Sequence, residues 1–161
     1  VKKNGYIGVV EVKGPNVFKG YWKQPEKTKS EFRDDGYFIT GDMGFLDQDN
    51  YLTIVGRNKD LIITGGLNVY PKEIETVIDQ DSNVDESAVV GVSHPDFGEG
   101  ILAIIVEKKG HSINVEIVNE TLRKNLAAFK LPKKIVFCEL PKTSTGKIQK
   151  FELRKKAKEI N

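Results

Sequence analysis

The sequence has few of the residues that form cross-links or bind metals. It contains one cysteine, Cys138, and two histidines, His94 and His111. A single cysteine cannot form a disulfide within the chain, and its apolar surroundings, "IVFCEL", predict a buried thiol in a reducing compartment. The histidines are not spaced as metal ligands, so the sequence predicts no metal site.

Long apolar runs and a strong charge bias are also lacking. No run approaches the ~20 residues of a membrane-spanning helix, and no signal peptide is recognisable. The net charge of +2 is too small to indicate nucleic-acid binding by itself. We therefore expect a cytoplasmic protein with no membrane span and no nucleic-acid partner. Because the sequence opens on a strand-like segment without methionine, we also expect a piece of a longer protein.

Residues 1–57 have the pattern of a β-rich region. The segment 6–12, "YIGVVEV", is rich in strand-forming residues and is followed by the turn residues "GPN". The segment 36–57 contains apolar strands, with "DQDN" as a hairpin turn between them. The segment 23–32 supplies one or two helical turns, and no long helix is predicted in this region.

Residues 58–161 alternate between strands and helices, which predicts a compact α+β unit of about a hundred residues. One helix is predicted to begin at Pro71, and a second covers 114–126 with Asn114 as its N-cap. A third, basic helix covers 150–160, with Leu153, Ala157 and Ile160 facing inward. Strands are predicted at 60–64, 86–92, 100–110 and 133–140. The two regions meet at the polar joint "GRNKD".

The segment 140–150, "LPKTSTGKIQK", places Lys147 directly after Gly146. It is not a Walker phosphate loop, because Pro141 stands where that loop has its first glycine and Ile148 where it has its Ser or Thr. Two readings are open. Lys147 is a solvated lysine in a turn, or it is a cation delivered on a flexible arm to an anion bound elsewhere.

Other polar and glycine positions also allow two readings. Asp42 ends "YFITGD", where it forms a turn with its own backbone or accepts hydrogen bonds from a ribose diol. Arg57 and Lys59 straddle the joint and are ordinary surface charges unless another signal assigns them a role. Gly65 and Gly66 allow close backbone approach to a neighbour, or serve a simple β–α turn.

The order of these segments is more specific than any one of them. "YFITGD", then "GRNKDLIITGGLNVYPKEIE", then "LPKTSTGKIQK" resembles the closing motifs of the adenylate-forming superfamily, which includes acyl-CoA synthetases, firefly luciferases and peptide-synthetase adenylation domains. The detail of residues 5–42 and 65–75 is most similar to the malonyl-CoA synthetase branch. The resemblance implies ATP and CoA as ligands, a carboxylic acid as substrate, and Mg²⁺ accompanying ATP on a part of the protein outside this chain.

The resemblance also implies a role for particular residues. Asp42 and Arg57 correspond to the residues that hold the ATP ribose, and Lys59 to the hinge. Gly65 and Gly66 correspond to the loop that lines the pantetheine tunnel, and Lys147 to the catalytic lysine of acyl-adenylate formation. A lysine acetyltransferase acting on Lys147 is implied as a partner.

The same resemblance implies a division of the chain. Residues 1–57 become the end of a large N-terminal domain, and residues 58–161 a mobile C-terminal domain that works against it. The triphosphate loop and the acyl pocket of the family have no counterpart here, so we expect the 161-residue chain to form no acyl-adenylate alone. Two alternatives stay open: a medium- or long-chain fatty-acid–CoA ligase, and a non-catalytic module that binds through the basic terminal helix.

Overall fold

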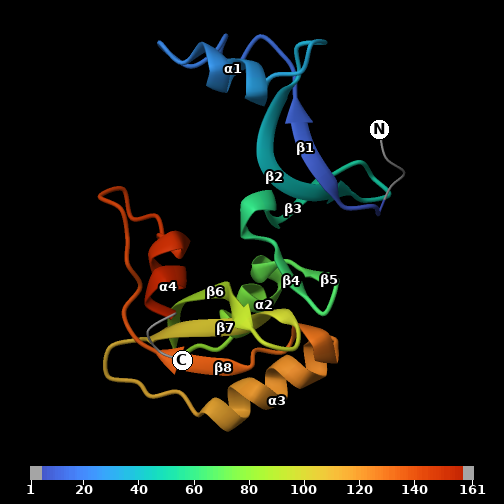
Figure 1. Ribbon diagram of the computed structural model, residues 1–161. Coiled ribbons are helices and arrows are strands. Elements are labelled where there is room, and N and C mark those ends of the chain that lie inside the picture. Colours follow the sequence, from blue (N-terminus) through green and yellow to red (C-terminus); the bar gives the residue numbers. More distant parts are fainter. Residues whose placement is uncertain (1–4, 158–161) are drawn as a thin grey trace. The chain divides into compact units, whose positions relative to one another are not determined.

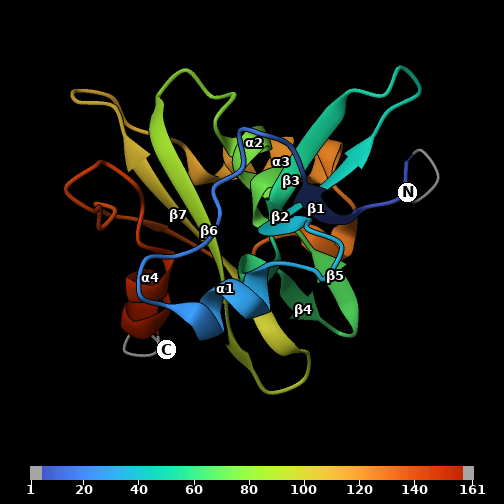
Figure 2. The ribbon, with the colours of Figure 1, turned by 90° about the horizontal axis from the view of Figure 1, so that it is seen from above.

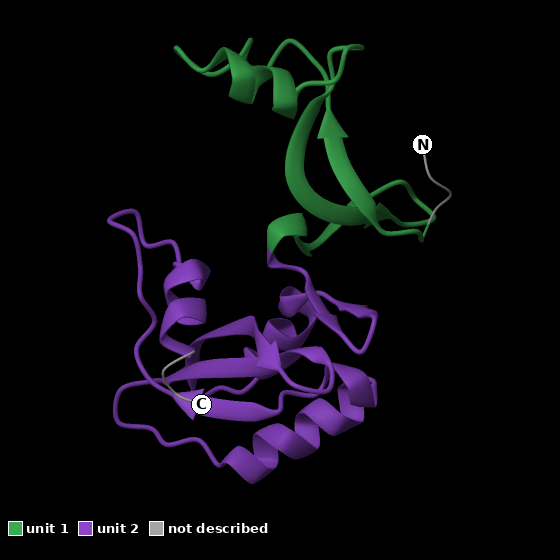
Figure 3. Cartoon of the chain, in the orientation of Figure 1, with its two compact units in different colours: residues 1–59 green, residues 60–161 purple. Residues whose placement is uncertain are grey.

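The computed structural model describes residues 5–157, which form two compact units. Unit 1 is residues 1–59 and unit 2 is residues 60–161. Figure 1 follows the chain by colour, and Figure 3 colours the two units separately. In the described part, no helix is long and apolar enough to cross a membrane.

Unit 1 is built on an antiparallel sheet of three strands in the order β1-β2-β3. Its elements are β1 (Gly8–Val12), α1 (Pro25–Glu31), β2 (Phe38–Leu46) and β3 (Leu52–Arg57). The hairpin between β2 and β3 turns at Asp47, whose Oδ1 accepts from the backbone N–H groups of Asp49 and Tyr51 at 2.9 and 2.8 Å. The predicted β-rich character and the turn at "DQDN" are therefore confirmed.

Unit 2 is built on a mixed five-stranded sheet and confirms the predicted α+β class. Strand β7 lies inside this sheet: β6 pairs with it antiparallel along its length, while β4 and the parallel strand β8 also pair with it. The elements are η1 (Asn58–Asp60, shared with the end of unit 1), β4 (Ile62–Thr64), β5 (Leu67–Val69), α2 (Pro71–Ile78), β6 (Val84–His94), β7 (Gly98–Glu107), α3 (Val115–Asn125), η2 (Ala128–Lys130), β8 (Lys134–Phe137) and α4 (Lys150–Ala157).

Alternation along β7 builds the core on both faces of the sheet. Ile101, Ala103 and Ile105 point to one face, where α2 and α3 cover them with Ile74, Ile78, Val118 and Leu122. Leu102, Ile104 and Val106 point to the other face, where Leu140 and two residues of α4, Leu153 and Ala157, cover them. Since successive side chains of a strand point to opposite faces, β7 is buried on both faces; the strand predicted at 100–110 is confirmed as far as Glu107.

The helix starts follow the local sequence. Pro71 occupies the first turn of α2, where its missing N–H costs no hydrogen bond. Asn114 is the N-cap of α3, and its Oδ1 accepts from the backbone N–H of Glu116 at 2.8 Å. Both starts agree with the prediction. The predicted inward position of Ile160 lies outside the described residues.

One prediction is wrong, and one of two open readings is excluded. Cys138 is exposed, not buried. Strand β8 ends at Phe137, so Cys138 lies beyond the last residue paired with β7, although its N–H still reaches the Ile105 carbonyl at 3.2 Å. Gly65 and Gly66 do not form a β–α turn; they join β4 to β5, a strand that the sequence did not indicate.

Candidate functional site

Lys147 lies on a short hairpin, residues 141–149, that leads directly into α4. The hairpin closes through an antiparallel bridge between Lys142 and Ile148. The backbone N–H of Thr143 donates to the Lys147 carbonyl at 2.9 Å, and the Lys147 N–H donates to Thr143 Oγ1 at 3.1 Å. The arm is therefore a hydrogen-bonded hairpin that presents an exposed Lys147, not an unstructured loop.

Gly146 is required by the turn of this hairpin. Its φ of +83° is left-handed, and its N–H donates to the Thr143 carbonyl at 2.9 Å. A turn followed by one left-handed residue is a common three-residue hairpin connection, and glycine adopts that conformation without steric cost. An added Cβ would meet no atom within 4 Å, so the backbone conformation, not crowding, selects glycine within the structure.

The part of the hairpin before its turn, which we call the first leg, is held to β6 by an ion pair. Lys142 Nζ donates to Glu86 Oε1 on β6. This hydrogen bond, together with the nearby charges of Glu86, Asp85 and Glu139, raises the pKa of Lys142 and keeps its ammonium charged. The side chain of Lys142 remains 42% exposed, so solvent screens much of the interaction.

Asp42 and Arg57 are brought together in unit 1 by the pairing of β2 with β3. They are opposite each other in the strand register, and Arg57 Nε lies 2.9 Å from Asp42 Oδ1. The Asp42 side chain is 30% exposed and the Arg57 side chain 55% exposed. The pair thus presents a carboxylate acceptor and guanidinium donors to solvent, which is the chemistry that a ribose diol requires.

Lys59 lies in the 3₁₀ helix η1 and is the last residue of unit 1. Its neighbour Asp60 is the first residue of unit 2 and accepts from Arg154 of α4 at 2.8 Å. Lys59 is thus placed at the joint between the units, whereas Asp60 is bound to the body of unit 2.

Gly65 and Gly66 form the two-residue turn of the β4–β5 hairpin. Both have positive φ, +55° and +78°, as a type I′ turn demands, and glycine is favoured at both positions of that turn. The Gly65 N–H donates to the Phe97 carbonyl at 2.9 Å, which ties this turn to the β6–β7 hairpin. Ile63, Leu67 and Phe97 beside it are 51%, 48% and 42% exposed, so the tip is apolar.

The two candidate surfaces of unit 2 are separated. Figures 1 and 2 show the Lys147 hairpin, which precedes α4, on the opposite side of unit 2 from the β4–β5 hairpin. One surface of unit 2 therefore presents Lys147 and another presents Gly65 and Gly66. Within residues 5–157, no group of three or more His, Cys, Asp or Glu side chains is placed to hold a metal ion.

Comparison with known proteins identifies the family. Residues 73–147 match the family described as the AMP-binding enzyme C-terminal domain. A long-chain-fatty-acid–CoA ligase of Bacillus subtilis (strain 168) is 43% identical over 147 residues, 91% of this chain and 26% of that enzyme. The chain belongs to the adenylate-forming superfamily of CoA ligases. The resemblance stated from the motifs is thereby confirmed.

Solved structures of adenylate-forming enzymes share the fold of the chain. ATP-bound MatB from Rhodopseudomonas palustris has a TM-score of 0.88 at 58% identity, over 98% of this chain and 31% of that chain. The o-succinylbenzoate CoA synthetase MenE from Bacillus subtilis, in complex with its acyl-adenylate OSB-AMP, has a TM-score of 0.87 at 32% identity, over 98% and 31%. The chain spans less than a third of the length of the relatives described here.

The sequence did not indicate some of the residues that hold the Lys147 hairpin in place. Thr143 holds the Lys147 turn through its N–H, its carbonyl and its hydroxyl, and the Gly at the fourth position of "TSTG" is a turn signal that could have indicated this. Glu75 and Glu86 hold the two ends of the hairpin from α2 and β6. No local signal could have revealed those contacts, because the partners are 75 and 56 residues apart in sequence.

Proposed function

We propose that the chain is part of an ATP-dependent acyl-CoA synthetase that acts on malonate or methylmalonate. In the first half-reaction a carboxylate oxygen attacks the α-phosphorus of ATP, and pyrophosphate leaves. In the second, the CoA sulfur, having lost its proton, attacks the acyl carbon of the adenylate, and AMP leaves. The whole-chain similarity to ATP-bound MatB carries this proposal, since MatB belongs to the malonyl-CoA synthetase branch.

Lys147 is proposed to act in the first half-reaction. That step joins two anions, so a cation between the carboxylate and the α-phosphate lowers the repulsion where it is greatest. At ~4 Å and an effective dielectric near 20, one such contact is worth about 4 kcal/mol. The hairpin supports this role, because it presents the exposed Lys147 on a hydrogen-bonded turn and so reduces the freedom lost on reaction.

Asp42 and Arg57 are proposed to bind the ribose of ATP. Arg57 pairs with Oδ1 of Asp42, and no contact of Oδ2 is found within the described residues. The carboxylate can therefore still accept a hydrogen bond from a hydroxyl group. The paired arginine orients the carboxylate. This pair fits the ligand by its donor and acceptor chemistry.

The second half-reaction is proposed to use the other surface of unit 2. The attacking thiol needs an approach that the lysine hairpin does not occupy, so a rotation at Lys59 would withdraw Lys147 and present Gly65 and Gly66 to pantetheine. The separation of the two surfaces supports an alternation of this kind. On this proposal, residues 1–57 complete a large N-terminal domain and residues 58–161 form the mobile domain.

A fatty-acid–CoA ligase is the second candidate, favoured by the similarity to the Bacillus subtilis enzyme. The two candidates differ in the pocket for the acid, since a malonate enzyme needs a cation for the distal carboxylate and a fatty-acid enzyme needs an apolar tunnel. A module that binds through its basic terminal helix is less well supported. Lys150, Arg154 and Lys155 of α4 are each paired with a carboxylate of unit 2.

The decisive experiment measures acid-dependent pyrophosphate release by the full-length protein with malonate, methylmalonate, acetate and palmitate. Release with malonate or methylmalonate supports the proposal, and release with palmitate alone supports the second candidate. Lys147→Ala should lower the rate about 10²–10³-fold, the typical effect of losing one electrostatic donor. If none of the four acids stimulates pyrophosphate release, or if the protein binds nucleic acid with a steep salt dependence, the synthetase proposal is wrong.

The 161-residue chain is proposed to be inactive by itself, with Mg²⁺ and the triphosphate held by a preceding part of the protein. ATP–pyrophosphate exchange by the chain alone should therefore stay at background. Exchange above background that is lost on Lys147→Ala would refute this.

A further inference from the structure

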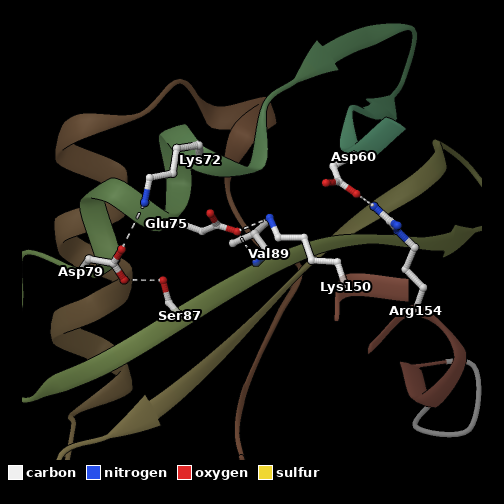
Figure 4. Close-up of polar contacts among 8 residues, drawn as sticks. All are labelled: Asp60, Lys72, Glu75, Asp79, Ser87, Val89, Lys150 and Arg154. Carbon is white, nitrogen blue, oxygen red and sulfur yellow. Dashed lines mark hydrogen bonds and ion pairs between the residues drawn. The ribbon is translucent and has the colours of Figure 1, made fainter. Parts of the chain in front are cut away.

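A buried carboxylate lies at the base of the Lys147 hairpin. Glu75 of α2 is 7% exposed, although Glu is rarely buried without a partner. Its Oε1 accepts from the Val89 N–H of β6 at 2.9 Å and from Lys150 Nζ at 2.5 Å, as Figure 4 shows. One carboxylate oxygen thus joins the helix α2, the edge strand β6 and the first residue of α4.

Lys150 is only three positions after Lys147 and, as the first residue of α4, directly follows the hairpin. Its side chain is 20% exposed, so its ammonium depends on Glu75 for compensation of its charge. The adjacent Gln149 N–H donates to the Pro141 carbonyl at 2.8 Å and closes the base of the hairpin. Through Lys150, Glu75 therefore holds the leg that carries Lys147.

Ile148, directly after Lys147, also packs partly buried against the core cluster that contains Leu140 and Leu153, and few polar contacts hold this leg besides the pair with Glu75. In the described part, α4 buries only Leu153 and Ala157, and its second polar contact is the pair between Arg154 and Asp60. The first leg is held by the more exposed pair between Lys142 and Glu86, whose attraction solvent weakens. Among the ion pairs of the hairpin and of α4, the one with Glu75 is the most buried.

We propose that Glu75 is a positioning residue for Lys147, which it places for acyl-adenylate formation by holding Lys150 at the base of the hairpin. The proposal rests on the proposed function. A shift of about 1 Å in a reacting group can cost a hundredfold in rate, so a loosened hairpin base should affect the step that uses Lys147. It should leave the thioester-forming step, which uses the other surface of unit 2, unchanged.

Glu75→Gln in the full-length protein tests the proposal. The amide keeps the shape and an acceptor for Val89 but removes the charge that Lys150 requires. We expect acid-dependent ATP–pyrophosphate exchange to fall about 10–100-fold. We expect thioester formation from a preformed acyl-adenylate and CoA to change less than twofold. Lys150→Arg should retain most of the exchange activity, since a guanidinium can still donate to Glu75.

Glu73→Gln is the matched control. Glu73 lies on the same helix and pairs with Lys130, a partly buried lysine in the same unit, but does not contact the hairpin. This variant should leave both half-reactions within twofold of the unmodified protein. If both glutamine variants lower both half-reactions in parallel, Glu75 has only a structural role and the proposal is wrong.

Amide hydrogen exchange gives a readout that does not need catalysis. Glu75→Gln should speed exchange at Gln149 and Gly146, whose N–H groups bond within the hairpin, and Glu73→Gln should not. If the unmodified protein shows no activity, the proposed function fails, but this measurement still decides the role of Glu75. Unchanged exchange at both amides would overturn it. Should Glu75→Gln fail to fold, the double variant Glu75→Gln with Lys150→Gln removes the unpaired charge and is measured in its place.

Discussion

Replacement of Gly146 tests whether the turn of the Lys147 hairpin needs glycine for its left-handed backbone conformation. Gly146 has φ +83°, and a Cβ there would meet no atom within 4 Å. The cost of Gly146→Ala is therefore the left-handed backbone alone, about 1 kcal/mol for a residue with a Cβ. Since 1.4 kcal/mol is tenfold, the opening equilibrium of the hairpin should rise about fivefold.

Hydrogen exchange at the Gly146 and Thr143 amides measures this opening, because both N–H groups bond across the turn. In Gly146→Ala the amides of residues 143 and 146 should exchange about fivefold faster, and pyrophosphate exchange should fall by no more than that factor. Gly146→Asn should be milder, because Asn tolerates the left-handed region, and Gly146→Val should be more severe.

Two results would refute the reasoning. Equal acceleration of amide exchange in the Ala, Asn and Val variants would show that the left-handed conformation is not what matters. A loss of activity above a hundredfold in Gly146→Ala, with amide exchange unchanged, would show instead that a ligand approaches this backbone too closely for a side chain. As a stability control, the free energy of unfolding of unit 2 in urea should fall by no more than about 1 kcal/mol in Gly146→Ala.

Three further predictions concern unit 2. Asn114→Ala removes the N-cap bond to Glu116 and should lower the free energy of unfolding in urea by about 1 kcal/mol, whereas Asn114→Asp should retain it. Ile105→Ala in the centre of the sheet should cost about 2–5 kcal/mol in the same assay, since Ile105 is fully buried; a cost below 1 kcal/mol would contradict the core described here. Burial and then the charge of Glu73 raise the pKa of Tyr70, so the folded state resists its ionisation. The stability that Tyr70 contributes is full below the ordinary tyrosine pKa of 10.0 and is lost as pH rises from there through the raised value. Over that pH interval, urea stability should fall more steeply in the unmodified protein than in Tyr70→Phe.

Local patterns were sufficient for most of the secondary structure. Asn114 and Pro71 mark helix starts because an N-cap side chain and a missing N–H act within one turn. The apolar run of β7 indicated a strand, because a nearly continuous apolar run is typical of strands that are covered on both faces. The order of three short motifs was also enough to identify the superfamily, which the comparisons confirm.

The sequence did not determine features that depend on which strands pair and where the pairing ends. Paired glycines suit a β–α turn and a hairpin equally, and only the pairing of β4 with β5 decided for the hairpin. Cys138 lies in an apolar run, but its exposure depends on where β8 stops pairing with β7. The contact of Asp42 with Arg57 follows from the register of β2 on β3, which the spacing of the residues alone does not set.

The sequence by itself determined which residues are available: a lysine after a glycine, an aspartate at a strand end, and a pair of glycines, in an order that indicates the family. The tertiary structure decided that the lysine stands on a closed hairpin and that Glu75 of a distant helix reaches its base. The physical reason is the separation along the chain over which each interaction acts. Turn and cap preferences act over a few residues, whereas a buried charge must find its partner wherever the folded chain brings one, here 75 residues away.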